Sequence, residues 1–286
     1  MSPTAGVAHR TLITRKLKGL ESLIGVHQVD YSSSGELWQF TGQNNSASED
    51  PLHPGITTLK QLYLKADPNY TGRYTVPLLW DTKKDVPVNN ESSEILRMLA
   101  FEFDHLLPEA QRETNRPGGG LYPEHLRSEI DALNEKVYRT VNNGVYMVGF
   151  AKSQESYNSN IISLFAALDE LDAHLENRTF LVGDHLTEAD IRLYVTLVRF
   201  DAGYNTSMQC SLKNIRNDYP HLHRYLRRLY WDNGAFNDAF RTTTLPLNIY
   251  THGYAESRRR FVLGNDAPLI VPSVPGEEVL IPRLTA

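Results

Sequence analysis

The sequence is short of cysteine and of long apolar runs. Cys210 is the one cysteine among 286 residues, which excludes a disulfide within the chain and a zinc site built from several cysteines. No apolar run approaches the ~20 residues that a membrane-spanning helix needs. The first residues are small and polar, without the apolar centre of a signal peptide. We therefore expect a protein of the reducing cytoplasm, with neither a metal nor a membrane as partner.

Lysine and arginine are outnumbered by aspartate and glutamate, 29 to 34. The formal net charge is −5, whereas a protein that binds nucleic acid needs a basic face. Hydrophobic residues make up 41% of the chain, which is typical of a globular protein with a substantial core. At about 100–200 residues per domain, the length allows two domains. We therefore expect a two-domain globular protein that does not bind nucleic acid.

Helical and extended patterns alternate in the first part of the chain, and helical patterns alone follow it. Apolar spacing predicts helices over 8–23, 57–66 and after 90, and β-type runs occur over 26–31, 73–81 and 86–88. The later helical segments are 123–142, 152–176, 187–203 and 218–232. These patterns predict a first domain over 1–106, a linker over 107–122, a helical domain over 123–245 and a tail over 246–286 that packs on the helical domain.

The linker contains three consecutive glycines, in "ETNRPGGGL". A phosphate-binding loop would need a strand before the glycines and a Lys-Ser or Lys-Thr pair after them, and neither is present. We interpret the stretch as a flexible connection.

A helix start is encoded in "GDHLTEADIRLYVTLVRFD". Thr187 is a good N-cap, and Asp190 follows three residues later, where the acidic partner of a capping box stands. The residues behind it are apolar almost all round, which is typical of a helix in the centre of a domain. We expect Thr187 and Asp190 to have a structural role.

The run "TVPLLW" contains a proline in a β-type segment. Proline cannot donate to a sheet ladder, so Pro77 implies an edge strand with a trans bond, a bulge, or a cis bond. A cis bond would leave the backbone N–H and C=O of Val76 free to pair with an extended, peptide-like ligand.

In the run "VNNESSEIL" a strand leads directly into a capped helix. The N-terminus of a helix offers free N–H groups and a positive dipole end, which favour a carboxylate. Ser92 could bind that carboxylate and Glu91 a nearby ammonium group, although plain helix capping explains Ser92 equally well. Together with Val76, these residues have the chemistry of a glutathione site.

Longer motifs resemble a known family. "LYLKADPNYTGRYTVPLLWD", "VNNESSEILRML", "NNGVYMVGFA" and "TEADIRLYVTLVRFD" are similar to the Xi class of glutathione transferases, the glutathionyl-hydroquinone reductases. The resemblance runs from about Ala8 to Tyr254. It implies an α+β fold, with an N-terminal thioredoxin-like domain followed by an all-α domain. In this chain, the first strand of the thioredoxin-like domain is expected to be absent, which would leave two apolar strand edges unpaired.

The resemblance also implies roles for individual residues. Trp38 matches a tryptophan that packs on glutathione, and Arg73 matches an arginine near its glycyl carboxylate. Val76, Glu91 and Ser92 match the remaining glutathione-binding groups, with Pro77 as a cis-proline. Tyr146 and Tyr254 resemble tyrosines that hydrogen-bond the phenolic oxygens of the substrate, although each could instead be an ordinary, partly buried core residue.

The family's reactive cysteine has no counterpart in this sequence. In the family, a cysteine in "CPWAHRTL" attacks the sulfur of a glutathionyl-hydroquinone, the hydroquinone leaves, and a second glutathione resolves the mixed disulfide. Aligning "AHRTL" places Ala5 at the cysteine position, and alanine offers no thiolate. Ser2 and Thr4 are poor substitutes, because no strand precedes them to hold them rigidly. Cys210 is expected to be a core residue.

Two functions follow from these observations. The first is a glutathione-dependent enzyme of the Xi type that acts on glutathionylated aromatic or quinone molecules, with glutathione as co-substrate. The second is a catalytically impaired protein that binds glutathione or acts as a scaffold, because the nucleophile position is Ala5. The resemblance also implies a homodimer.

Overall fold

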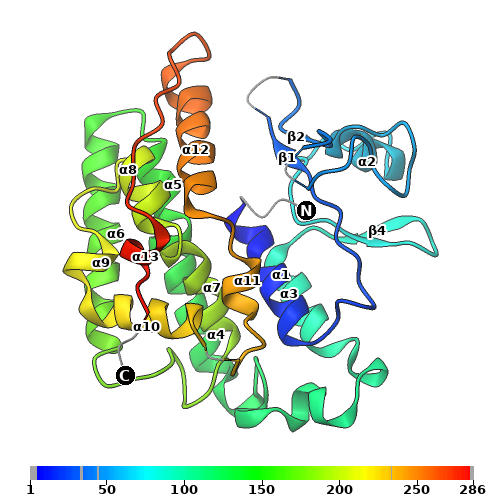
Figure 1. Cartoon of the computed structure of the whole chain (residues 1–286), viewed down its shortest axis with the longest axis horizontal. Coiled ribbons are helices and arrows are strands. Elements are labelled where there is room, and N and C mark those ends of the chain that lie inside the picture. The colour runs from blue at the N-terminus through cyan, green and yellow to red at the C-terminus, as the bar shows by residue number, and fades with distance from the viewer. Residues whose placement is uncertain (1–4, 33–34, 44, 233, 284–286) are drawn as a thin grey trace. The chain divides into compact units, whose positions relative to one another are not determined.

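The computed structural model describes residues 5–32, 35–43, 45–232 and 234–283 (Figure 1). It divides into two compact units: the first ends at Phe103 and the second begins at Asp104. In the described part of the chain, every strand belongs to the first unit. No described helix is both long and apolar enough to span a bilayer.

The first unit combines three helices with four short strands in its described residues. In chain order the elements are α1 (Gly6–Leu17), β1 (Asp30–Tyr31), β2 (Trp38–Gln39), α2 (Leu59–Ala66), β3 (Leu79–Asp81), β4 (Val86–Asn89) and α3 (Ser92–Phe101). The predicted β-type runs are therefore mostly extended segments outside a ladder. Both strand pairs are antiparallel, β1 with β2 and β3 with β4.

The two strand pairs do not join into one sheet among the described residues. A cavity of about 630 Å³ is lined by Val26 and Val29 from the segment leading into β1, by Leu78 and Trp80 at β3, and by apolar side chains of α2 and α3. Apolar residues at both strand pairs therefore line one cavity.

Local sequence explains where the helices of this unit begin. Thr58 is the N-cap of α2 and forms a capping box with Gln61, so two backbone N–H groups at the helix start are satisfied. Glu91 caps α3: its carboxylate accepts a hydrogen bond from the Ser93 N–H at 3.4 Å. The N-cap of α3 is thus Glu91, one residue before Ser92.

The second unit is helical. Its α-helices are α4 (Arg127–Val137), α5 (Gly144–Gly149), α6 (Gln154–His174), α7 (Glu188–Leu197), α8 (Asn205–Ser207), α9 (Ile215–Asp218), α10 (Pro220–Tyr230), α11 (Ala239–Thr243), α12 (Leu247–Arg258) and α13 (Glu277–Leu280). Three π-helical turns interrupt or extend them: η6 (Tyr138–Asn142), η7 (Phe200–Tyr204) and η8 (Arg259–Leu263). The long helices coincide with the periodic segments of the sequence.

The connection into the second unit is folded into short 3-10 helices. These are η1 (Asp104–Leu106), η2 (Glu109–Gln111), η3 (Glu113–Asn115), η4 (Pro117–Gly119) and η5 (Glu124–Leu126). The buried Glu113 carboxylate accepts a hydrogen bond from the Leu121 N–H, and Gly120 has φ +85°, where a Cβ atom would collide with Glu113. A stretch that the sequence predicts to be a flexible linker is therefore held by a buried carboxylate.

Helix α7 is buried in the centre of the second unit. Ile191, Leu193 and Tyr194 are each 0% exposed, and burying a side chain of this kind stabilises a fold by about 2 kcal/mol. At the start of α7, the Asp190 carboxylate accepts hydrogen bonds from the Thr187 N–H at 2.8 Å and the Leu181 N–H at 2.9 Å. It thereby joins the helix start to the loop before it.

The C-terminal tail packs on α10. The His223 Nε2 atom lies 3.0 Å from the Leu280 carbonyl oxygen, and the indole N–H of Trp231 donates to the Ile281 carbonyl at 2.9 Å. The Arg227 guanidinium donates to the carbonyls of Pro282 and Arg283, at 2.6 Å and 2.5 Å. Each of these contacts is made to a backbone carbonyl of the tail.

Candidate functional site

Ala5 stands at the start of the first helix. It is the N-cap of α1, and its carbonyl accepts hydrogen bonds from the N–H groups of Ala8 and His9 at 3.1 Å each. A thiolate at an N-cap is stabilised by the helix dipole and the free N–H groups, which lowers the pKa of a cysteine there. The methyl group of Ala5 has no ionisable atom to benefit from this field. The alternative hydroxyls, Ser2 and Thr4, lie outside the described residues.

The Val76–Pro77 peptide bond is cis. Val76 is buried, and among the described residues its backbone N–H and C=O have no hydrogen-bond partner. The segment just before it is held in place, because the Tyr63 hydroxyl donates to the Thr75 carbonyl at 2.8 Å and the Asn90 amide donates to the Thr75 hydroxyl at 3.2 Å. A residue of α2 and one just before α3 thus hold the segment that leads into the cis bond.

Several of the predicted glutathione-binding residues meet in one part of the first unit. Ala5 and Trp38 pack, partly buried, against the apolar cluster that contains Val76. Trp38 lies on β2 and its ring is edge-on to Tyr31, with 5.8 Å between ring centres. Three candidates from distant parts of the sequence therefore share one core.

The start of α3 adds two more candidates. Ser92 is buried, and the Arg10 guanidinium of α1 donates to its hydroxyl at 3.4 Å. Glu91 is exposed, and its carboxylate accepts hydrogen bonds from the N–H and hydroxyl of Ser93. The remaining candidate, Arg73, is exposed, and its carbonyl accepts a hydrogen bond from the Tyr70 hydroxyl at 3.2 Å.

In the second unit, the two predicted tyrosines meet a third. The Tyr146 hydroxyl of α5 lies 3.0 Å from that of Tyr204 and 3.3 Å from that of Tyr254 on α12. The Tyr254 hydroxyl donates to that of Tyr204 at 2.7 Å. Tyr146 is half-buried, and the other two are buried. The three hydroxyls form a closed triangle whose most accessible member is Tyr146.

Tyr204 and a buried arginine beside it were not identified from the sequence. Arg199 is 0% exposed; its Nε donates to the Val195 carbonyl at 2.6 Å, and its guanidinium lies 4.3 Å from the centre of the Tyr250 ring. Burial raises the pKa values of Tyr204 and Tyr254, and the positive charge of Arg199 partly offsets that rise. The sequence signal that could have identified Arg199 was an arginine two residues after the end of the buried helix α7.

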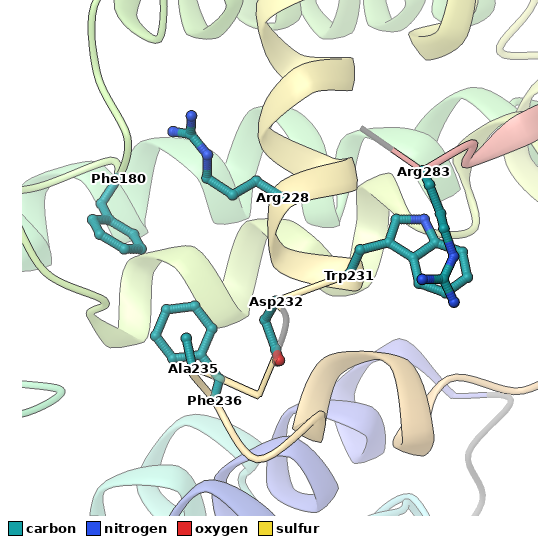
Figure 2. A pocket seen from close by; sticks show the side chains of 7 residues that line it. All are labelled: Phe180, Arg228, Trp231, Asp232, Ala235, Phe236 and Arg283. Atoms are coloured by element: carbon teal, nitrogen blue, oxygen red, sulfur yellow. The ribbon is translucent and has the colours of Figure 1, made fainter. Parts of the chain in front are cut away.

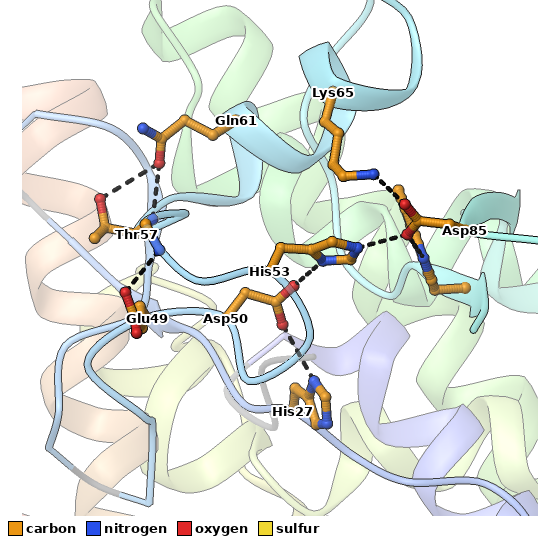
Figure 3. A network of polar contacts seen from close by, with 10 residues as sticks. His27, Glu49, Asp50, His53, Thr57, Gln61, Lys65 and Asp85 are labelled. Atoms are coloured by element: carbon orange, nitrogen blue, oxygen red, sulfur yellow. Dashed lines mark hydrogen bonds and ion pairs between the residues drawn. The ribbon is translucent and has the colours of Figure 1, made fainter. Parts of the chain in front are cut away.

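The first unit also contains a polar network that sequence patterns did not indicate (Figure 3). The His53 ring contacts the Asp50 carboxylate through Nδ1, and its Nε2 lies 2.6 Å from Asp85, which also contacts Lys65. Burial lowers the pKa of His53, but its hydrogen bonds to Asp85 and Asp50 outweigh burial and leave the pKa raised. The contact with Lys65, followed by that with His53, lowers the pKa of Asp85 to about 2.

This network fastens the loop before α2 to the turn between β3 and β4, because Asp50 lies in that loop and Asp85 in that turn. No group of three or more His, Cys, Asp or Glu side chains suited to a metal ion occurs among the residues that the structure describes. The network therefore has a structural role: it holds the loop before α2 against the β3–β4 turn.

The single thiol is far from solvent. Cys210 is 0% exposed, and its Sγ lies 3.7 Å from the Val145 carbonyl oxygen. Burial raises the pKa of this thiol well above its usual range, so the thiolate is not populated near neutral pH. Cys210 therefore cannot supply the nucleophile that Ala5 lacks.

Two family domains match the chain. The glutathione S-transferase N-terminal domain matches residues 6–101, and the C-terminal domain of the same family matches residues 154–228. The chain is 47% identical over 233 residues to the glutathione S-transferase omega-like 2 protein of Schizosaccharomyces pombe, covering 81% of this chain and 72% of that protein. It is also 47% identical over 224 residues to the glutathionyl-hydroquinone reductase PcpF of Sphingobium chlorophenolicum, covering 78% and 67%.

Solved structures agree with these matches. The glutathione transferase Xi of Phanerochaete chrysosporium is 46% identical, with a TM-score of 0.86 over 96% of this chain and 83% of that one. The glutathione-bound YqjG of Escherichia coli is 41% identical, with a TM-score of 0.81 over 91% and 80%. The predicted fold class, a thioredoxin-like domain followed by an all-helical domain, is confirmed. The chain belongs to the glutathione S-transferase family, in its Xi class of glutathionyl-hydroquinone reductases.

Proposed function

We propose that this chain binds glutathione through its first unit and is a glutathione transferase-like protein of the glutathionyl-hydroquinone reductase type, without cysteine-dependent reduction of its own. The Val76 backbone pairs with the cysteinyl part of glutathione, and Trp38 packs against it. Ser92 binds the γ-glutamyl carboxylate and Glu91 its ammonium group, while Arg73 binds the glycyl carboxylate.

The observation that carries this proposal is the shared core of Ala5, Trp38 and Val76. It supports a site in which a peptide-like ligand lies between the free backbone of Val76 and the N-terminus of α1, where a nucleophile would act. Alanine at that N-terminus leaves binding possible, but a thiolate cannot form there.

For the aromatic part of the substrate, we propose the tyrosine triangle. Tyr146 and Tyr254 hydrogen-bond phenolic oxygens: Tyr146 donates its proton, whereas Tyr254, whose own proton goes to Tyr204, accepts one from a phenol O–H. The chemical class is a hydroquinone or a related phenol carried by glutathione.

Binding is tested by calorimetric titration of the 286-residue chain with glutathione. Replacing Ser92 by Ala should weaken binding about tenfold, because the variant loses a hydrogen bond to a charged group. The exposed Ser48→Ala is the matched control and should leave the affinity unchanged. Equal affinities of the two variants would contradict the assigned role of Ser92, and no binding to the unmodified chain would contradict the site as a whole.

Chemistry is tested by turnover of a glutathionyl-hydroquinone. The unmodified chain should release no hydroquinone, because Ala5 cannot attack the substrate sulfur. The variant Ala5→Cys should gain turnover and accumulate a mixed disulfide with glutathione, visible by mass spectrometry, whereas Ala5→Ser should not. Turnover by the unmodified chain would overturn the proposed loss of reduction.

We also propose that the protein acts in the cytoplasm, as a homodimer. A reducing compartment suits the free thiol of Cys210. Sedimentation velocity should give the mass of two chains, and a monomer at micromolar concentration would contradict the dimer.

A further inference from the structure

The three tyrosine hydroxyls of the second unit are not equally far apart. The Tyr254–Tyr204 edge of the triangle is 2.7 Å long and the Tyr204–Tyr146 edge 3.0 Å, whereas the Tyr146–Tyr254 edge is 3.3 Å. An O–H···O hydrogen bond is usually about 2.7–2.8 Å long. The weakest link is therefore the one between the two tyrosines that are proposed to contact the substrate.

The protons of the triangle run in one direction. Tyr254 donates to Tyr204. Tyr204 is 1% exposed, and within the described part of the chain its hydroxyl bonds only to the other two tyrosines, so its own proton goes to Tyr146. Burial raises the pKa of Tyr204 and that of Tyr254, so both keep their protons near neutral pH. Tyr146 is thus left with a proton to donate, and Tyr254 with an oxygen that accepts one.

Packing fixes the short edge between Tyr204 and Tyr254. The π-helical turn η7 lies against α12, where the Thr251 hydroxyl donates to the Ala202 carbonyl at 2.8 Å. Gly203 lies beside the Tyr254 ring, and a Cβ atom there would collide with that ring. The absence of a side chain at Gly203 lets the rings of Tyr204 and Tyr254 approach to 4.5 Å between their centres. The acceptor of the Tyr254 proton is therefore held in a fixed position.

We infer that Tyr204 makes the triangle selective for a hydroxyl group over an ether or a carbonyl. A phenolic O–H enters the long edge, accepts the proton of Tyr146 and donates its own proton to Tyr254. An ether oxygen or a quinone carbonyl also accepts from Tyr146, but it has no proton to give, so the Tyr254 oxygen is left buried without a donor. This inference rests on the proposal that the triangle holds the aromatic part of the substrate. Tyr204 is a positioning residue, because it acts on the ligand only through the other two tyrosines.

The probes are 4-hydroxyacetanilide and its methyl ether, 4-methoxyacetanilide, titrated separately into the full chain without glutathione. Binding is followed by saturation-transfer NMR, and the hydroxyl compound should have a Kd of about 1 mM. The ether should bind about tenfold more weakly, because it leaves the Tyr254 acceptor unpaired. Equal affinities of the two probes for the unmodified chain would overturn the inference.

Tyr204→Phe separates the positioning role from a purely structural one. Phenylalanine keeps the ring and its packing but removes the acceptor of the Tyr254 proton, so Tyr146 and Tyr254 can both donate to the ligand. The ether should then bind more tightly than it does to the unmodified chain, and the tenfold preference should fall to about twofold or less. Neither damage to the fold nor a clash with the methyl group would strengthen binding of the ether. An unchanged preference in this variant would contradict the assigned role of Tyr204.

Tyr254→Phe is a second variant, and a different pattern is expected from it. It removes the acceptor of the ligand proton, so the hydroxyl compound should lose about tenfold in affinity while the ether keeps its affinity. Tyr146→Phe should weaken both probes, because both accept the Tyr146 proton. A hydroxyl compound that binds Tyr254→Phe as tightly as the unmodified chain would also overturn the inference.

A second place where an aromatic ring fits serves as the control. A cavity of about 390 Å³ lies at the end of α10, with Phe180 and Phe236 on one side and Trp231 on the other (Figure 2). Phe180→Ala alters the wall of this cavity at a half-buried position and should change neither affinity. If Phe180→Ala weakens both probes and Tyr146→Phe weakens neither, the probes bind in this cavity and the inference is wrong.

Two results distinguish the role of Tyr204 from the position of the aromatic site. If Tyr146→Phe weakens both probes but the hydroxyl and the ether bind equally well, the triangle holds the aromatic ring and Tyr204 does not set its selectivity. If neither probe shows saturable binding up to about 10 mM, ten times the expected Kd, both the aromatic site and the role of Tyr204 are refuted. Glutathione is absent from these titrations, so failure of the glutathione site does not affect them.

Discussion

The hydroxyl of Tyr225 provides a test of the charge at the start of α7. It donates to the Asp190 carboxylate at 2.9 Å, and both side chains are buried. Burial raises the pKa of Asp190 to about 6 from its ordinary value of 3.8, although the hydrogen bonds from Leu181, Thr187 and Tyr225 oppose the rise. The carboxyl group is therefore ionised at pH 8 and mostly protonated at pH 5.

Replacing Tyr225 by Phe removes this donor without changing the shape of the core. At pH 8 the variant loses a hydrogen bond to a charged acceptor, so the free energy of unfolding should fall by about 2 kcal/mol. At pH 5 the acceptor is neutral, and the loss should be about 0.5–1 kcal/mol. The predicted signature is thus a destabilisation that grows with pH.

The direction of this pH dependence follows from the difference between the folded-state and unfolded-state pKa of Asp190. Because the folded-state pKa of Asp190 is raised, its contribution to stability is complete below the unfolded value of 3.8 and is lost as the pH rises through about 6. Removing the Tyr225 donor raises the folded-state pKa further, so the variant loses more stability than the unmodified chain over the same pH interval.

Urea unfolding of the full chain at pH 5 and pH 8, followed by circular dichroism at 222 nm, measures both values. The control is Tyr157→Phe, because the Tyr157 hydroxyl donates at 2.9 Å to a neutral acceptor, the Gln209 carbonyl. Its effect should be at most about 1 kcal/mol and equal at both pH values. A Tyr225→Phe effect that is also equal at both pH values would refute an ionised Asp190 with a pKa near 6.

Three further outcomes can be checked on the same chain. Cys210 should not react with a thiol reagent in the folded protein and should react fully in urea, because it is buried and its thiol pKa is raised; labelling of the folded chain would contradict this. His53→Gln should remove a loss of thermal stability that the unmodified chain shows as the pH rises above 6.5, because the raised pKa of His53 stabilises the fold only while the ring is charged; calorimetric scans at pH 6 and 8.5 measure it. Gly120→Ala should lower the free energy of unfolding in urea by about 2 kcal/mol, because φ is +85° and the new Cβ meets Glu113; a neutral effect would show that Glu113 can move aside.

Local sequence signals predicted the helices better than the strands. Helices α2, α6 and α7 follow apolar periodicity and capping residues close by in the sequence, and α10 follows apolar periodicity behind Pro220 at its first position. Strand pairing depends on a partner elsewhere in the chain, so the β-type runs over 26–31 and 73–81 retain only two and three paired residues. A strong β propensity cannot form a ladder where the neighbouring strand is not in place.

The residues of the candidate site likewise differ in whether a local sequence motif predicts them. Val76, Pro77, Glu91 and Ser92 lie in short, ordered motifs, so residue types alone pointed to a peptide-like ligand. Tyr204 meets Tyr146 and Tyr254 from 58 and 50 residues away, which no local pattern encodes.

The residues of the His53 network lie in polar segments that sequence patterns describe only as loops. Histidines and carboxylates in such stretches are usually exposed and independent of each other. The sequence alone therefore does not predict that the loop before α2 and the β3–β4 turn contact each other.

The way α10 holds the C-terminal tail has a consequence for comparing sequences. His223, Arg227 and Trp231 bind the tail through its main-chain carbonyls, which every amino acid has. Pro282 and Arg283 can therefore vary during evolution while the tail keeps its path, so long as the three donors persist, whereas Leu280 and Ile281 are buried and must stay apolar. Homologous tails should be aligned by those donors, since identity within the tail itself understates how similar the structures are.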